Sequence, residues 1–285
     1  MILIDANHLA IVSLMAECKG MPEYDEGLIR HIFLNQIRNI KRKFGREYGE
    51  MILCYDSRVP SWRKTVFKEY KACRKKSRED SKMDWNKLFA FLSELKQEVD
   101  QYFPYRTISI DTAEADDIIA CICHLYPNEN NIIVSNDKDF YQLHRYPSTS
   151  QYSIYHKAIV KCENPERYLF EHTLRGDKGD GVPNYLSDGD TFVSKKRQRP
   201  ITDKHIQEMW DQRNKNANWQ SCLTQTQIEN YTRNDILINL DNIPNYLKNE
   251  VKDEMEKPNN RNAANIHKYL ASKGMNLMLD YVTDF

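Results

Sequence analysis

The chain has 285 residues, of which 40% are hydrophobic, and its 41 Lys and Arg residues balance its 41 Asp and Glu residues. This composition excludes a disordered or fibrous chain and supplies enough apolar residues for one large domain or two ordinary ones. No apolar run approaches the roughly 20 residues that cross a bilayer, so we expect no association with a membrane. The seven cysteines form no Cys-x-x-Cys pair and favour free thiols in a reducing cytoplasm.

Opposite charges are concentrated in two separate segments of the chain. Residues 58–78 contain nine Lys or Arg residues and a single acid, whereas residues 111–117 contain four acids and no base. Such segregation indicates function more strongly than a net charge of zero does, because each segment presents one sign of charge to a partner.

Apolar runs of strand length alternate with helical patterns in the first half of the chain. Apolar residues at three- and four-residue spacing predict helices over residues 25–44, where Gly45 would end the helix, and over residues 84–103. Strands that alternate with helices are typical of parallel sheets. We therefore predict an α/β fold with a mostly parallel central sheet flanked by helices. The expected strands are Met1–Ile4, Met51–Tyr55, Thr107–Ile110 and Asn131–Val134.

The strand signal disappears beyond about residue 165, where the sequence becomes polar and rich in Asn, Lys and Asp. Weak helical patterns follow. We predict two domains: an α/β domain over residues 1–168, and a smaller, mainly helical domain over residues 169–285. The expected helices of the second domain lie near residues 165–175, 202–213, 224–231, 243–256 and 262–280.

An acidic residue follows every predicted strand. Because the carboxyl ends of parallel strands meet at one edge of a sheet, where ligands collect, we expect these side chains to lie together. A later pair, in the sequence Gly-Asp-Lys-Gly-Asp-Gly, has the spacing to join them from a loop. The predicted acidic cluster contains Asp5, Asp56, Glu114, Asp116, Asp117, Asp137, Asp139, Asp177 and Asp180.

Nine carboxylates in a small volume repel one another unless cations neutralise them. Carboxylate oxygens, with no His or Cys among them, suit two Mg²⁺ ions, with Mn²⁺ as a substitute, and do not suit zinc. Two such ions would activate a water molecule and stabilise the leaving oxygen of a phosphodiester, so the cluster predicts phosphoryl hydrolysis. Taken singly, some of the acids have structural explanations. Asp111 and Glu114 have the spacing of a helix capping box, and Asp137 and Asp139 suit a turn.

A basic segment, at about residues 58–82, follows the second predicted strand and interleaves Trp62, Phe67 and Tyr70 with Lys and Arg. Such a segment offers cations to phosphates and aromatic rings on which unpaired bases stack. The structural alternative, slightly favoured for an isolated run, is a solvated helix with its three rings turned to the core. Because the segment emerges beside the acids, we predict that its cations hold a polyanion against them, with binding that weakens steeply with salt.

These motifs resemble the metal-dependent 5′ nucleases, a family that includes flap endonucleases and the 5′ nuclease domains of bacterial DNA polymerases. Within the family they are most similar to the RNase H enzymes of T-even bacteriophages. The resemblance rests on the basic segment, which looks like the family's arch over the active site, and on five acidic motifs in a fixed order. These motifs are Ile4-Asp5, Tyr55-Asp56, Glu114-Ala-Asp-Asp117, Ser135-Asn-Asp-Lys-Asp139 and Gly176-Asp-Lys-Gly-Asp180.

The resemblance implies roles for individual residues. The implied ligands of the first metal ion are Asp5, Asp56, Asp116 and Asp137. The implied ligands of the second ion are Asp139, Asp177 and Asp180, with Glu114 and Asp117 acting through water. Lys71 is expected near the scissile phosphate and joins the catalytic acids Asp5, Asp56, Asp116, Asp137 and Asp139. The residues expected to bind nucleic acid are Arg63, Lys64, Lys68, Tyr70, Lys71, Arg74, Lys75, Lys195, Lys196 and Arg197.

The resemblance also implies a 5′→3′ exonuclease and flap endonuclease that removes lagging-strand RNA primers during phage DNA replication. The implied partners are DNA with a 5′ flap or fork, an RNA–DNA hybrid, a single-stranded-DNA-binding protein and a polymerase clamp. The protein is expected to act as a monomer in the host cell cytoplasm. Residues 181–190 lack the glycine-rich hairpin with which many members grip duplex DNA, and the basic residues at 195–197 would substitute for it.

Three other classes of protein share single features with this chain. A ribonuclease that degrades messenger or transfer RNA would share the acids but would not need the basic segment or residues 170–285. A haloacid-dehalogenase phosphatase needs a second Asp two residues after the first, where this chain has Asn7. A non-catalytic DNA-fork-binding protein would have lost some of the acids, and none is lost.

Overall fold

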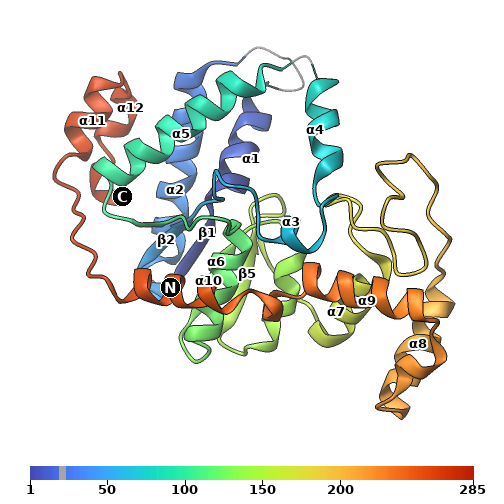
Figure 1. Cartoon of the computed structure of the whole chain (residues 1–285). Coiled ribbons are helices and arrows are strands. Elements are labelled where there is room, and N and C mark those ends of the chain that lie inside the picture. Colours follow the sequence, from blue (N-terminus) through green and yellow to red (C-terminus); the bar gives the residue numbers. More distant parts are fainter. Residues whose placement is uncertain (19–23, 82) are drawn as a thin grey trace.

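The computed structural model describes residues 1–18, 24–81 and 83–285 (Figure 1). Its described residues form one six-stranded sheet with the order β3-β2-β1-β4-β5-β6. Neighbouring strands are parallel except for β5 and β6, which are antiparallel at one side of the sheet. The strands are β1 (Ile2–Asp5), β2 (Met51–Cys54), β3 (Arg106–Ile108), β4 (Asn131–Val134), β5 (Thr149–Ser153) and β6 (Ala158–Val160).

The predicted α/β fold is confirmed, and each of the four expected strands is present. The third, β3, is shifted towards the amino terminus and ends at Ile108. Strands β5 and β6 were not predicted. β5 contains the buried polar residues Thr149, Gln151 and Ser153, and β6 is a short, mostly exposed strand. β5 therefore lacks the apolar run that marks the predicted strands, and the apolar run of β6 is only three residues long.

Helices cover both faces of the sheet because its strands are apolar on both sides. Ile2 and Ile4 of β1 pack into the core beneath α1, α2, α5, α11 and α12, whereas Leu3 packs into the core beneath α6 and α10. This arrangement is the one that parallel strands require. The helices of the two layers are α1 (Ala6–Cys18), α2 (Glu26–Tyr48), α5 (Trp85–Tyr102), α6 (Ala115–Leu125), α10 (Asn245–Glu256), α11 (Ile266–Ser272) and α12 (Asn276–Leu279).

Three of the expected helices have wrong bounds. The helix expected near residues 224–231 continues to Ile238 as α9 (Gln225–Ile238). Gly45 does not end α2, which continues to Tyr48 and is capped by Gly49 with φ +76°. A glycine inside a helix costs only about 1 kcal/mol, and α2 is held by the buried side chains of Ile40 and Phe44 on the same turns. Residues 262–280 form two helices because Gly274, with φ +69°, separates α11 from α12.

Helices after residue 164 serve two parts of the molecule (Figure 1). α7 (Pro165–Arg175), α8 (Asp203–Lys215) and α9 (Gln225–Ile238) share a core that includes Phe170 and Trp219. α10, α11 and α12 instead return to the sheet. No helix in the described ranges is long and apolar enough to cross a membrane. The 3₁₀ helices are η1 (Asp139–Arg145), η2 (Trp219–Cys222), η3 (Leu240–Asn242) and η4 (Val282–Asp284).

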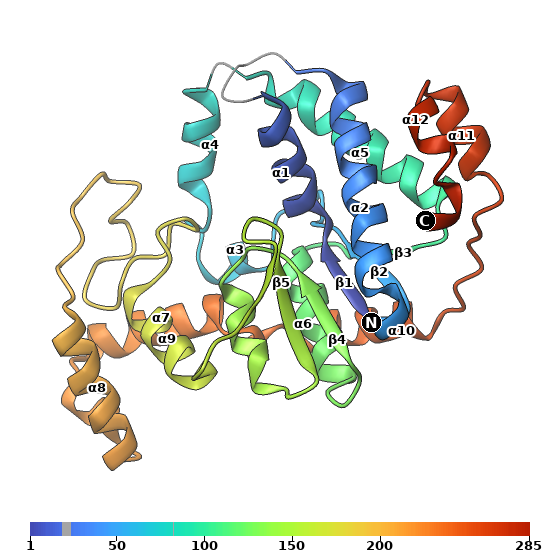
Figure 2. The same ribbon diagram turned by 180° about the vertical axis from the view of Figure 1, so that it is seen from behind.

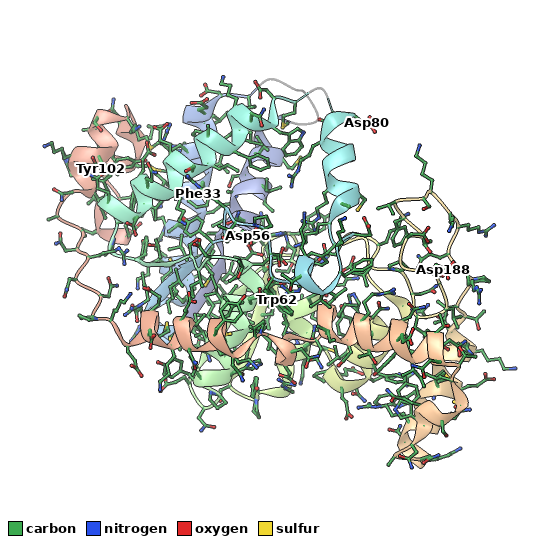
Figure 3. The ribbon with its side chains drawn as sticks, viewed as in Figure 1. Phe33, Asp56, Trp62, Asp80, Tyr102 and Asp188 are labelled. Carbon is green, nitrogen blue, oxygen red and sulfur yellow. The ribbon has the colours of Figure 1, made fainter. Side chains whose placement is uncertain are left out.

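The basic segment lies at the carboxyl ends of the parallel strands, which we call the carboxyl edge. It contains the short helix α3 (Arg63–Val66) and the helix α4 (Ala72–Glu79). Figure 3 shows Trp62 near Asp56 at this edge, while Asp80 marks the far end of α4, which stands away from the sheet. Residue 82, at the end of the expected arch, lies outside the described residues.

Candidate active site

The first two acids follow neighbouring strands. β1 ends at Asp5, which pairs in register with Cys54 of β2, and Asp56 follows two residues later. Asp5 Oδ1 accepts the backbone N–H of His8 at 2.9 Å. Asp56 Oδ1 accepts the backbone N–H of Ala115 at 2.9 Å, which ties the end of β2 to the first residue of α6.

The next three acids begin α6, where the expected capping box is displaced by one turn. Glu114 is the N-cap residue, and Asp117 Oδ2 accepts its backbone N–H at 3.0 Å. The pair Asp111 and Glu114 therefore does not form the box, and Asp111 is exposed. Asp116 lies between the two capping residues and lines a small pocket with Asp139, Asp177 and other side chains.

The loop after β4 holds Asp137 and Asp139 in a compact turn. Asp137 Oδ1 accepts the backbone N–H of Asp139 at 2.9 Å, and Ser135 Oγ accepts the backbone N–H of Asp137 at 3.1 Å. The same Ser135 hydroxyl donates to Asp5 Oδ2 at 3.4 Å. The turn that the sequence suggested is therefore real, and it also fixes these acids beside Asp5.

The last two acids reach the site from the loop that follows α7. Gly176 ends this helix with φ +67°, and a Cβ there would lie 2.4 Å from the carbonyl oxygen of Val182, so only glycine fits. Asp177 Oδ1 accepts the backbone N–H of Asp180 at 3.0 Å. The backbone carbonyl of Asp180 accepts the N–H of Lys71 at 2.7 Å, which joins this loop to the basic segment.

Burial and mutual repulsion both perturb the carboxyl groups of the acidic cluster. Burial, followed by the charges of Asp56 and Asp137, raises the pKa of Asp5 to about 7. Burial and the charge of Asp137 likewise raise the pKa of Asp139 to about 7. Burial holds the pKa of Asp116 well above its usual range even though Arg63 opposes the shift. Such perturbed carboxyl groups are typical of functional sites.

Cations from the basic segment contact one side of the cluster. Lys71 Nζ lies 2.5 Å from Glu114 Oε1, and Arg74 donates to Asp180 Oδ1 at 2.5 Å. Burial raises the pKa of Glu114, but the charges of Lys71 and Arg63 outweigh burial and hold this pKa below its usual value. The basic segment therefore partly neutralises Glu114 and Asp180, whereas none of its described side chains forms an ion pair with Asp5 or Asp139.

Asp117 and Arg63 form a buried pair. Arg63 donates to both oxygens of Asp117, at 3.0 and 2.8 Å, and the indole N–H of Trp62 donates to Asp117 Oδ2 at 3.0 Å. Arg63 also donates to the carbonyl oxygen of Leu237 at 2.8 Å and is only 2% exposed. The prediction that Arg63 contacts nucleic acid is therefore wrong. Its side chain is buried, and its hydrogen bonds to Asp117 and Leu237 hold the acids in place.

The aromatic side chains of the basic segment face inward. Trp62, Phe67 and Tyr70 are all buried, so these rings are not available to unpaired bases and the structural alternative holds for them. The Tyr70 hydroxyl lies 2.8 Å from Glu114 Oε2 and 2.7 Å from Asp180 Oδ2. The predicted role of Tyr70 in nucleic-acid binding is therefore corrected to that of a link between two acids.

Of the remaining predicted nucleic-acid contacts, Lys71 is partly buried against Glu114, and the others are at the surface wherever the structure describes them. Lys64, Lys68 and Arg74 are exposed on the basic segment, and the side chain of Lys75 lies outside the described residues. Exposed cations also occupy the loop after residue 190, where Lys196 Nζ lies 2.9 Å from Asp190 Oδ2. The other two members of this loop group, Lys195 and Arg197, are exposed.

His172 belongs to the site and was missed by sequence reasoning, which expected no histidine there. Its ring lies 3.5 Å from Asp139 Oδ1 through Nδ1 and 3.5 Å from Asp177 Oδ2 through Nε2. These three side chains are close enough to share one metal ion. The one feature of the sequence that points to His172 is its position in the last turns of the helix before Gly176, close to Asp177.

Comparisons with known proteins define the class of this chain. Residues 1–169 match the family model described as the 5′-3′ exonuclease N-terminal resolvase-like domain, and residues 164–285 match the C-terminal domain of T4 RNase H. The chain therefore belongs to the 5′-3′ exonuclease family and is a 5′ nuclease, a phosphodiester hydrolase.

Individual relatives agree with this assignment. Ribonuclease H of Enterobacteria phage T4 is 27% identical over 292 residues, which cover 99% of this chain and 95% of the relative. Flap endonuclease Xni of Shewanella woodyi is 33% identical over 146 residues, which cover 47% of this chain and 54% of the relative.

Solved structures share the fold. The flap endonuclease of bacteriophage T5, in a pseudo-enzyme-product complex with DNA and metal ions, has a TM-score of 0.62 at 16% identity, covering 90% of this chain and 99% of the other. The T5 protein co-crystallized with metal ions has a TM-score of 0.60 at 16% identity, covering 90% of this chain and 98% of the other.

Proposed function

We propose that this protein is a Mg²⁺-dependent 5′→3′ exonuclease and flap endonuclease that removes RNA primers and adjacent DNA from lagging-strand fragments during phage replication. The observation that supports the proposal best is the excess of carboxylates at one edge of the sheet, next to exposed cations. An enzyme that hydrolyses phosphodiesters needs metal ligands and phosphate contacts in this proximity.

The acids fit a pair of hard divalent ions. Their oxygens are the ligands that Mg²⁺ and Mn²⁺ prefer. Burial, followed by neighbouring negative charge, raises the pKa values of Asp5 and Asp139, and a cation would relieve that charge. When bound, the ions would supply an activated water and stabilise charge on the leaving oxygen. We assign Asp5, Asp56, Asp116 and Asp137 to one ion. We assign Asp139, Asp177 and Asp180 to the other, with His172 beside them.

The chain's own cations position the phosphate. Lys71 and Arg74 are bound to Glu114 and Asp180, so they lie directly over the acids. A phosphate that enters the site would compete with these carboxylates for the same two cations. The buried pair of Arg63 and Asp117 holds the start of the segment in place, since Arg63 also binds the backbone of α9.

The substrates that we propose are DNA with a 5′ flap or fork and RNA–DNA hybrids. Support comes from the names of the relatives, which include a ribonuclease H and a flap endonuclease, and from the T5 structure with DNA. We also propose that residues 169–285 act as the DNA-binding domain, contributing Asp177, Asp180 and the basic loop at 195–197. The proposed replication partners are a single-stranded-DNA-binding protein and a polymerase clamp, with the enzyme acting as a monomer.

A cleavage assay tests the proposal. Wild type and Asp137→Ala are incubated with a 5′-labelled RNA–DNA hybrid and a 5′-flap duplex, in Mg²⁺, Mn²⁺ or EDTA. We expect metal-dependent release of short 5′ products by wild type alone. Wild type that binds the flap duplex but cuts neither substrate in either metal would contradict the proposal and favour a fork-binding protein.

A further inference from the structure

The turn between β5 and β6 stands beside the acidic cluster. β5 runs parallel to β4, with Tyr152 in register with Val134, so both strands end at the carboxyl edge. Figure 2 shows the turn that follows β5 at the same edge as the end of β1, near the start of α1. Residues 154–157 therefore lie at the rim of the site, on the side of the sheet away from β3.

Asn136 fixes this turn to the loop that carries the acids. Asn136 Oδ1 accepts the hydroxyl of Ser153 at 2.9 Å and the backbone N–H of Tyr155 at 3.0 Å. On its other side, Asn136 Nδ2 lies 2.8 Å from His8 Nε2 of α1. Because Asn136 immediately precedes Asp137, the backbone at Tyr155 keeps a set position relative to the acids.

The turn presents an aromatic ring and cations to solvent. Tyr155 is 80% exposed, and the ring of His156 meets its ring edge-on with centroids 5.0 Å apart. Lys157, also exposed, has φ +51°, a backbone region in which glycine or asparagine is the usual residue. Residues 154–161 contain two lysines and a histidine and no acid. A strained turn that keeps a lysine and exposes a tyrosine suits a polyanion with aromatic bases.

We propose that Tyr155 is a stacking platform for an unpaired base of the 5′ single strand at the entrance to the active site, with Lys157 binding a neighbouring phosphate. The inference rests on the proposed function and adds a contact to it. The rings at Trp62, Phe67 and Tyr70 are buried and cannot serve as platforms. Tyr155 supplies at the rim of the site the exposed ring that the basic segment lacks.

The alternative partner for this surface is a β-strand of another protein, which would pair with the outer edge of β6. Ile159 of this strand is 53% exposed, which suits such a partner. The position of Tyr155 at the active-site rim and the absence of acids from the turn favour a nucleic acid. The experiment separates the two, because a protein-binding strand would leave DNA affinity unchanged when Tyr155 is replaced.

Binding is measured in EDTA, where no cutting occurs, by fluorescence anisotropy of three labelled duplexes. One has a short single-stranded 5′ arm, one has the same arm with abasic sites, and one is blunt. For Tyr155→Ala we expect binding of the intact arm to weaken about fivefold or more, and binding of the blunt duplex to stay unchanged. Tyr155→Phe keeps the ring and should bind like wild type. Leu277→Ala, which removes an equally exposed side chain on α12, is the matched control.

Three results would overturn the inference: unchanged binding of the intact arm by Tyr155→Ala, equal weakening for arm and blunt duplex, or a loss by Tyr155→Ala that persists on the abasic arm. In each case wild type still binds the arm and cuts it in Mg²⁺, so the proposed function stands. Wild type that neither binds the arm nor cuts it would instead refute the proposed function itself.

Discussion

Two clusters of buried charge in this molecule are built in opposite ways. Between α2, α5 and α11, Arg30 and the hydroxyl of Tyr269 each donate to Glu98 Oε2 at 2.7 Å. Burial raises the pKa of Glu98, but Arg30, Lys273 and Tyr269 outweigh burial and hold it below its usual value. At the carboxyl edge, by contrast, burial and neighbouring acids raise the pKa of Asp5 to about 7.

This difference in charge pairing indicates that one cluster has a structural role and the other a binding role. Every oxygen of Glu98 has a donor, so the charges join three helices that are far apart in sequence. The acids at the carboxyl edge have too few cations, so their ionised state opposes folding until a cation binds. A protein that retains such repulsion gives up stability for a binding site. The two clusters should therefore respond oppositely to substitution, to pH and to metal.

The largest effect is expected at Asp5. Asp5→Asn should lower the cleavage rate by at least about a hundredfold, because a bound metal ion contributes several kcal/mol to the transition state. In EDTA the same variant should melt at a higher temperature than wild type, because one repelling charge is gone. Cleavage assays and thermal unfolding measure the two effects. Asp111→Asn, which changes an exposed acid outside the cluster, should alter neither; a less stable Asp5→Asn would contradict the comparison.

Glu98→Ala should have the opposite effect on stability. Removing Glu98 leaves Arg30 buried without its main partner, so the free energy of unfolding should fall by about 3–5 kcal/mol. Glu94→Ala removes the half-exposed second partner of Arg30 and should cost less than about 1 kcal/mol. Urea unfolding compares the two variants. Equal losses would show that burial does not set the strength of this cluster.

The two clusters should also give opposite pH dependences. In EDTA, Asp5 and Asp139 bind protons more tightly in the folded chain, so stability should fall as pH rises from about 4 towards 7. The lowered pKa of Glu98 gives stability that is present above about pH 4.5 and is lost as the pH falls below it. Urea unfolding across this range measures both. Mg²⁺ should remove most of the loss towards pH 7, and a flat profile in EDTA would argue against repulsion among the acids.

The smallest effect is expected in the exposed loop after residue 190. Lys196→Ala should leave thermal stability unchanged, since its ion pair with Asp190 is at the surface. If Lys196 contacts a phosphate, the slope of log affinity for a flap duplex against log salt should become shallower by about one. Lys252→Ala on α10 is the matched exposed control. An unchanged slope would remove Lys196 from the predicted nucleic-acid contacts.

The sequence alone predicts four of the six strands and the acids that follow them, because both are local signals. An apolar strand followed by an acid can be recognised within a few residues, and parallel topology brings such strand ends together. β5 cannot be recognised in this way because its buried residues include a polar one. The side chain of Gln151 is buried because it donates hydrogen bonds to the carbonyl oxygens of Ser135 and Asp137.

Other parts of the site depend on contacts between distant segments. In the sequence, Arg63 cannot be distinguished from the other cations of the basic segment. Its buried hydrogen bond joins it to Leu237, which is 174 residues away. The inward orientation of Trp62 depends on Asp117, and the place of His172 in the site depends on Asp139. A residue pattern gives the chemistry of such side chains, but only the fold decides whether they face solvent or the interior.

We infer that the acidic cluster binds the divalent ions of a 5′ nuclease. Bound Mn²⁺ can be counted by electron paramagnetic resonance for wild type and for Asp5→Asn. We expect two ions per wild-type chain, weakened binding in Asp5→Asn, and displacement of Mn²⁺ by Mg²⁺. Folded wild-type protein that binds no Mn²⁺ would contradict it.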